Sequence, residues 1–137
     1  MNLMIINGPN LNLIGSREIQ IYGAKTFDEY FEKITRKYVQ VNLTYFQSNI
    51  EGELIDQIQK AKVDGVILNA GGYTHTSVAL RDCIAATDVP VIEVHLSNVA
   101  SRESFRHESL ITPVSKGCIM GFGLESYELA MYYFLNR

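Results

Sequence analysis

Ionisable side chains in two short segments of the sequence have the types that acid–base chemistry needs. The segment NGPNLNLIGSREIQIYG, residues 7–23, carries Arg17 and Tyr22 within one loop-like stretch. A nearby guanidinium stabilises the ionised form of a phenol, so Tyr22 is a candidate base and Arg17 the cation that activates it. His95, in EVHLSN at residues 93–98, is a candidate acid because an imidazole exchanges a proton near neutral pH.

Other polar groups nearby suit the binding of an anion. Arg106, the backbone amides around Leu96 and Ser97, and the helix start after Gly71-Gly72 are all groups that hold a carboxylate. Each residue also has a plainer interpretation. Loop asparagines such as Asn10 and Asn12 are common turn formers, the two glycines can serve a turn, and a single histidine is most often structural. Arg17 could pair with Glu18 at the surface, and Tyr22 could simply pack its ring.

The elements that must position these residues alternate along the chain. Apolar runs predict strands at 3–7, 42–47, 65–69, 89–94 and 114–120, and helical spacing predicts helices at 26–38, near 76–87 and at 126–137. Another helix is expected after Ser48 and Glu51, which resemble a cap, as Thr26 and Glu29 do for helix 26–38. A short helix is expected within 102–109.

Strands that alternate with helices predict crossover units and a parallel sheet. At 137 residues, the best fit is one domain, residues 1–137, with a flavodoxin-like doubly wound sheet of strand order 2-1-3-4-5 and helices on both faces. Ligands of such sheets bind at the carboxyl ends of the strands. The residues expected to share one pocket there are Asn10, Asn12, Arg17, Tyr22, Asn69, His75, His95, Ser97 and Arg106.

Composition and missing motifs argue against several other classes of protein. A net charge of −3 is unlike the basic stripe of a general nucleic-acid binder, and no apolar run is long enough for a membrane span. The phosphate-loop, dinucleotide-binding and GxSxG patterns are absent, and His75, His95 and His107 lack the spacing of metal ligands. With no leader pattern, we expect a cytoplasmic protein in which Cys83 and Cys118 are buried free thiols.

Six segments together closely resemble type II 3-dehydroquinate dehydratases, the type II dehydroquinases. They are NGPNLNLIGSREIQIYG, FQSNIEGELID, NAGGYTHTSVALRD, EVHLSN, RESFR and GFG, and they follow the family order over essentially the whole chain. The resemblance implies the flavodoxin-like fold and the dehydration of 3-dehydroquinate to 3-dehydroshikimate, in the shikimate pathway or in quinate breakdown. It implies no metal and no organic cofactor, and a dodecamer built from four trimers.

The resemblance also implies roles for individual residues. Tyr22 corresponds to the base, Arg17 to the cation that keeps it ionised, His95 to the acid, and Asn12 to a residue that holds a water near the enolate oxygen. Residues at substrate-binding positions are Asn10, Asn69, Gly71, Gly72, His75, Asp82, Leu96, Ser97 and Arg106. The loop from Gly15 to Tyr22 corresponds to the family's mobile lid.

Two positions depart from the family pattern, and two other functions compete with it. Ile50 stands where many members have histidine, and Ser126 where glycine commonly precedes the tyrosine; both departures suggest a change in packing or subunit contacts only. A flavin-binding electron carrier would need a hydroxyl-rich phosphate loop after the first strand. A receiver-like signalling module would need acidic residues where Asn7 and Asn69 stand.

Overall fold

All five predicted strands form, and they pair in parallel in the order β2-β1-β3-β4-β5. The computed structural model describes residues 1–16 and 25–137. Its strands are β1 (Asn2–Asn7), β2 (Asn42–Gln47), β3 (Gly65–Asn69), β4 (Val91–His95) and β5 (Gly117–Met120). The predicted fold class and strand order are therefore confirmed.

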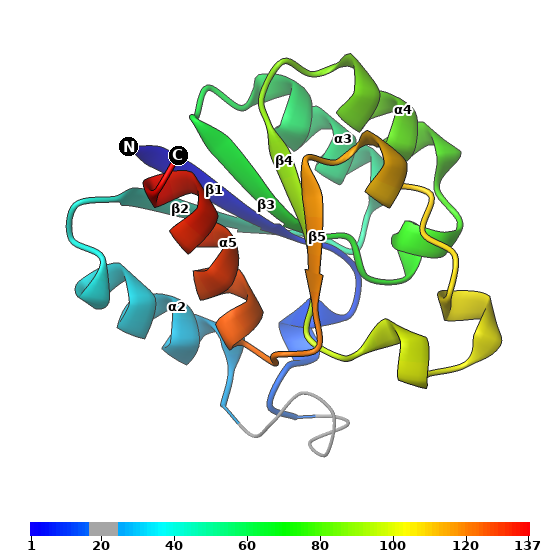
Figure 1. The fold of residues 1–137 in the computed structure, drawn as a ribbon, viewed down its shortest axis with the longest axis horizontal. Helices are drawn as coiled ribbons and strands as arrows, with labels where there is room; N and C mark the ends of the chain where they lie inside the picture. Colours follow the sequence, from blue (N-terminus) through cyan, green and yellow to red (C-terminus); the bar gives the residue numbers. More distant parts are fainter. Residues whose placement is uncertain (17–24) are drawn as a thin grey trace.

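Helices cover both faces of the sheet, which is why the central strands are apolar along their whole length. The helices are α2 (Phe27–Lys37), α3 (Glu51–Lys60), α4 (Val78–Ala86) and α5 (Glu125–Leu135). Figure 1 shows α2 and α5 together on one face and α3 and α4 together on the other. Every residue of β3 and of β4 is buried between these two layers. Such a three-layer arrangement leaves the strand ends as the part of the central sheet that a ligand can reach.

Each pair of helices closes its own hydrophobic core. On the α2/α5 side, Ile34 and Met131 pack with the strand residue Ile67. On the α3/α4 side, Leu54 and Leu80 pack with Leu68, the next residue of the same strand. Adjacent residues of β3 point to opposite faces, so this one strand contributes to both cores.

The helix α2 begins as the sequence predicts and is joined to α5 by one carboxylate. The Thr26 hydroxyl accepts a hydrogen bond from the Glu29 amide, as a capping residue does. Glu128 of α5 accepts hydrogen bonds from Lys37 at 2.6 Å, Tyr38 at 2.9 Å and Tyr30 at 3.3 Å. Burial alone would raise the pKa of Glu128, but these hydrogen bonds outweigh it and hold the pKa below its ordinary value.

Three local predictions differ from the structure. Ser48 does not cap α3 together with Glu51: its hydroxyl instead accepts from the Ile50 amide and donates to Glu53. Within 102–109 only a 3₁₀ turn forms, η4 (Ser104–Arg106). Cys83 is a buried free thiol as expected, whereas Cys118, on the edge strand β5, is free but only partly buried.

The two residues that depart from the family pattern, Ile50 and Ser126, lie in different environments. Ile50 is exposed where α3 begins, and the buried Ser126 hydroxyl accepts a hydrogen bond from the Phe122 amide at 3.3 Å. Within residues 1–16 and 25–137, no helix is long and apolar enough to cross a membrane.

Replacing Glu128 by glutamine should destabilise the protein by about 1–3 kcal/mol, because three donors then lose a charged acceptor. The comparison is Glu32→Gln on the exposed face of α2, where an ion pair with Arg36 should contribute less than about 0.5 kcal/mol. Urea unfolding of both variants measures the difference.

The same unfolding experiment has a predicted dependence on pH. The pKa of Glu128 is lower in the folded than in the unfolded protein, so its contribution is fully present above the ordinary value of 4.5 and is lost as the pH falls through the lower folded value. The wild-type and Glu128→Gln stabilities should therefore converge in acid. Equal stabilities at neutral pH would contradict this account of how α2 and α5 are joined.

Candidate active site

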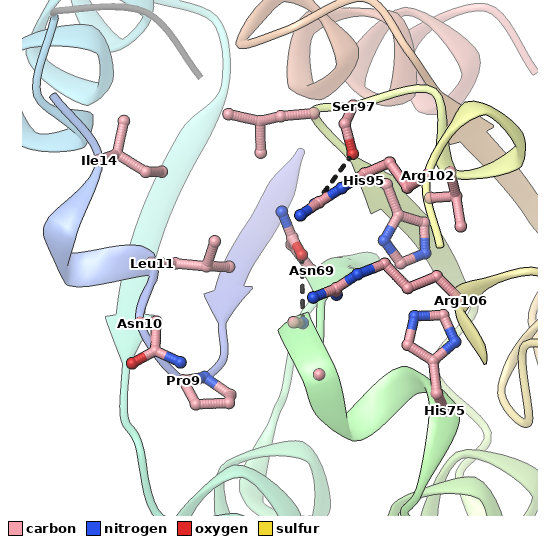
Figure 2. Close-up of a pocket in the computed structure, with 14 residues that line it drawn as sticks. Pro9, Asn10, Leu11, Ile14, Asn69, His75, His95, Ser97, Arg102 and Arg106 are labelled. Carbon is pink, nitrogen blue, oxygen red and sulfur yellow. Dashed lines mark hydrogen bonds between the residues drawn. The ribbon is translucent and has the colours of Figure 1, made fainter. Parts of the chain in front are cut away.

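A cavity of about 130 Å³ opens where β1, β3 and β4 end, as expected for a doubly wound sheet. Figure 2 shows the side chains around it: Asn10 and Leu11 follow β1, Asn69 ends β3, and His95 ends β4. The full lining consists of Pro9, Asn10, Leu11, Ile14, Asn69, Gly71, Gly72, His75, His95, Leu96, Ser97, Val99, Arg102 and Arg106. Three strands and the loops that follow them thus build one site.

Close backbone packing closes the side of the cavity between β1 and β3. A Cβ atom on Gly8 would lie only 2.6 Å from the Ala70 carbonyl oxygen, so only glycine fits there. Gly71 has a φ of 58° and lies against Pro9, in the left-handed region that glycine adopts without strain. The Gly8 amide donates to the Asn69 carbonyl at 2.7 Å and fixes the loop after β1 against the end of β3.

A buried hydrogen-bond network sets the orientation of Asn69. The Tyr127 hydroxyl donates to Asn7 Oδ1 at 2.7 Å and accepts from Asn69 Nδ2 at 3.1 Å. Asn69 Oδ1 in turn accepts from the Gly71 amide at 3.2 Å. Tyr127 is fully buried, and burial raises the pKa of its phenol, so it remains a neutral hydrogen-bond donor. The amide plane of Asn69 is therefore held from both ends.

His95 is held by a carboxylate from its own strand. Its Nε2 lies 2.7 Å from Glu93 Oε2, and Glu93 is completely buried. Burial alone would raise the pKa of Glu93, but hydrogen bonds from His95, Thr112 and Ser109 outweigh it and keep the pKa below its ordinary value. An ionised carboxylate only accepts, so Nε2 carries the hydrogen and Nδ1 is the nitrogen that can exchange a proton with a ligand.

The charged groups around the cavity favour an anion. Arg102 and Arg106 approach it from the segment after β4, and the described lining residues include no carboxylate. His75 Nδ1 lies 2.7 Å from the Glu108 carbonyl oxygen, which only accepts, so Nδ1 carries the hydrogen and Nε2 is the nitrogen that remains for a ligand. The rings of His75 and His95 lie 6.5 Å apart between centroids.

Most of the residues expected from the sequence meet in this cavity. They are Asn10, Asn69, Gly71, Gly72, His75, His95, Leu96, Ser97 and Arg106. Asn12, in the turn η1 (Leu11–Leu13), is exposed and does not line it. Asp82 lies on α4, also away from the lining, with its side chain exposed. Arg17 and Tyr22 fall outside the described residues.

Three residues at or behind the site were missed by the sequence analysis. Glu93 is the one charged residue in the apolar run VPVIEV, and this was a visible signal, because a buried carboxylate requires a hydrogen-bonding partner. Arg102 precedes Arg106 by four residues in RESFR, and its guanidinium lies 3.5 Å from the Ser97 hydroxyl. Tyr127 falls on the helical period of the last helix, which predicts only a core residue, because its hydroxyl partners Asn7 and Asn69 come from distant strands.

These features define a flavodoxin-like α/β protein with a cavity at its strand ends that is lined by two arginines and by a histidine paired with a buried carboxylate. Comparison with known families names the class more exactly. The family model "Dehydroquinase class II" matches residues 1–135, so the chain belongs to the class II dehydroquinase family.

Individual relatives agree with this assignment. A 3-dehydroquinate dehydratase of Campylobacter jejuni subsp. jejuni is 55% identical over 135 residues, which cover 96% of this chain and 85% of the relative. A 3-dehydroquinate dehydratase of Bacillus licheniformis is 49% identical over 139 residues, which cover 98% of this chain and 96% of the relative. The crystal structure of a type II dehydroquinase from Butyrivibrio crossotus matches with a TM-score of 0.95 at 42% identity, over 99% and 98% of the two chains.

Removal of the Tyr127 hydroxyl should weaken both the fold and the site. In Tyr127→Phe the buried Asn7 Oδ1 and Asn69 Nδ2 lose their shared partner, which should cost about 1–3 kcal/mol of unfolding free energy. Tyr132→Phe, at an exposed position of the same helix, should cost almost nothing. Urea unfolding tests this, and equal stability of the two variants would show that the network is not needed.

Proposed function

We propose that this chain dehydrates 3-dehydroquinate to 3-dehydroshikimate by an acid–base elimination through an enolate, with Tyr22 as the base and His95 as the acid. The observation that carries the proposal is the position of His95, which lines the cavity at the strand ends together with Arg102 and Arg106 and has its Nε2 on the ionised Glu93. Membership of the dehydroquinase family supports the substrate, which is a carboxylic acid with several hydroxyl groups.

Substrate binding follows from the charges of the cavity. The substrate carboxylate would lie against Arg106 and the backbone amides of Leu96 and Ser97, where β4 gives way to a loop. Asn69, with its amide fixed by Tyr127, and His75, through Nε2, would bind hydroxyl groups on the opposite side. Asn10, Gly71 and Gly72 complete the wall, and Arg102 adds a second guanidinium. A ligand held at both ends in this way is placed for reaction.

The first chemical step is the removal of a proton from the carbon beside the ketone. The Tyr22 phenolate takes this proton, and the electron pair of the C–H bond forms the enolate. Arg17 keeps Tyr22 ionised, and Asn12 holds a water that donates to the enolate oxygen. This step rests on the family resemblance of the segment that contains SRE and IYG.

The second step is the departure of the hydroxyl group as water. The enolate electrons form the new carbon–carbon double bond while the C–O bond breaks, and His95 gives a proton from Nδ1 to the leaving oxygen. Glu93 holds Nε2–H at 2.7 Å and so stabilises the protonated imidazole before it gives up that proton. Glu93 is thus a positioning residue, because it acts on His95 and does not itself contact the leaving group.

The proposal also covers the cofactor requirement, the metabolic role and the location of the enzyme. The reaction needs no metal or organic cofactor, because the base, the acid and the carboxylate anchor are all side chains or backbone groups. The product can serve the synthesis of aromatic amino acids, and in a quinate-degrading cell the same step serves catabolism. The cytoplasmic location stays a prediction.

Oligomer formation would explain the position of Asp82. This residue matches a substrate-binding position of the family, yet its side chain on α4 is exposed and away from the cavity of its own chain. We propose that it reaches the cavity of a neighbouring copy in a dodecamer of four trimers. The exposed Ile50 is one more residue available for such contacts.

A mixing experiment tests this arrangement. Light scattering should give a mass far above the 15.4 kDa of one chain. Asp82→Ala and Tyr22→Phe should each have low activity, and oligomers reassembled from both variants should regain part of it, since some sites then receive both native residues. A monomeric wild type, or mixed oligomers no more active than their parents, would refute the shared site.

The proposed reaction is tested by adding 3-dehydroquinate to the purified protein and following the absorbance of the conjugated enone of the product. Tyr22→Phe removes only the phenolic oxygen, and turnover should fall by about 10²–10⁴-fold. Arg17→Lys keeps the charge but loses the planar guanidinium, so it should also slow turnover. Tyr132→Phe, at an exposed position on α5, is the control. Near-normal turnover in folded Tyr22→Phe would remove Tyr22 as the base.

A further inference from the structure

A thiol lies beside the two residues that carry the acid step. Cys118 of β5 is the register partner of Glu93 on β4, so both side chains point to the same side of the sheet. His95, two residues after Glu93, points to that side as well. The carboxylate oxygen of Glu93, a ring nitrogen of His95 and the sulfur of Cys118 all lie within 4.8 Å of one another.

These three groups are of the types that bind Zn²⁺. Carboxylate, imidazole and thiolate are its usual protein ligands, at about 2.0–2.3 Å from the metal. Ligand atoms of a tetrahedral site at those bond lengths are separated by roughly 3–4 Å. The three ligand atoms, which lie within 4.8 Å of one another, are thus near the spacing that an ion requires. The thiol is the group that favours a soft cation over Mg²⁺ or Ca²⁺.

The surroundings give an ion both a route and a fourth ligand position. Cys118 is partly exposed at the edge of the sheet. A second cavity, of about 250 Å³, is lined by Glu93 and His95 together with Arg106, His107, Thr112 and Met120. This cavity is large enough for a water molecule to complete the coordination.

We propose that Glu93, His95 and Cys118 form an inhibitory site for Zn²⁺ or a similar thiophilic cation. The ion would bind His95 through Nε2, so the imidazole hydrogen would then lie on Nδ1, and it would replace the hydrogen on the Cys118 sulfur, which passes to solvent. The Nδ1–H of a neutral, metal-bound imidazole is a much weaker acid than that of a doubly protonated imidazole, so His95 would protonate the leaving hydroxyl far more slowly. The inhibitory effect rests on the proposed function of His95, whereas the binding of the ion does not.

The test uses the full-length protein, first treated with a chelator, and two matched variants. Cys118→Ser keeps the size of the side chain but removes the soft ligand, and Cys83→Ser alters the other free cysteine, on α4. Co²⁺ serves as a spectroscopic probe, because bonding to a thiolate gives a sulfur-to-metal charge-transfer band. Zn²⁺ is then titrated against turnover of 3-dehydroquinate.

We expect the charge-transfer band in the wild type and in Cys83→Ser, and its loss in Cys118→Ser. Zn²⁺ should inhibit the first two proteins alike, and Cys118→Ser should need at least about tenfold more Zn²⁺ for the same inhibition. Absence of the band in the wild type, or equal inhibition of all three proteins, would overturn the site. Absence of the band in the wild type together with normal turnover refutes the metal site alone, whereas a band without turnover in any protein refutes the proposed function alone.

Discussion

The buried hydrogen bonds of Tyr127 join the three elements on which the site depends. Its hydroxyl bridges Asn7 at the end of β1 and Asn69 at the end of β3, and its own helix, α5, is the last element of the chain. The two strands are neighbours at the point where the strand order reverses, and Tyr127 adds a side-chain bridge there to the backbone bond between Gly8 and Asn69. Because buried polar groups must be paired, formation of this network requires that the sheet, α5 and the loop after β3 all be in place.

Glu93 has the corresponding role on the other side of the cavity. The connection from β4 to β5 contains only short 3₁₀ turns, η3 (Val99–Ser101), η4 and η5 (Thr112–Val114), where the other crossovers contain an α-helix. Ser109 and Thr112, from this connection, both donate to the Glu93 carboxylate. The same buried charge therefore fixes the loop that carries Arg102 and Arg106 and holds the ring of His95. The Glu93 carboxylate therefore influences both the shape of the pocket and the charge around His95.

The sequence predicted the fold well because each central strand is a continuous apolar run and because α2 and α3 each have a clear apolar stripe. It placed His95 and Asn69 correctly, since both end a buried strand and the topology brings such ends together. It did not predict that Asp82 lies on the exposed face of α4, away from the cavity of its own chain. The partners of Tyr127 and Cys118 were equally inaccessible, because they depend on strand pairing and on side-chain packing between residues far apart in sequence. The short helix expected within 102–109 forms only as the 3₁₀ turn η4.

The central claim is that the cavity at the ends of β1, β3 and β4 holds the substrate with His95 at the leaving hydroxyl. A crystal structure of the protein with 3-dehydroshikimate, the proposed product, tests it most directly. The account predicts the carboxylate against Arg106 and the amides of Leu96 and Ser97, a hydroxyl near Asn69, and His95 Nδ1 facing the carbon from which the oxygen departs. A product bound elsewhere, or bound here with its carboxylate at the opposite end and His95 remote from that carbon, would contradict it.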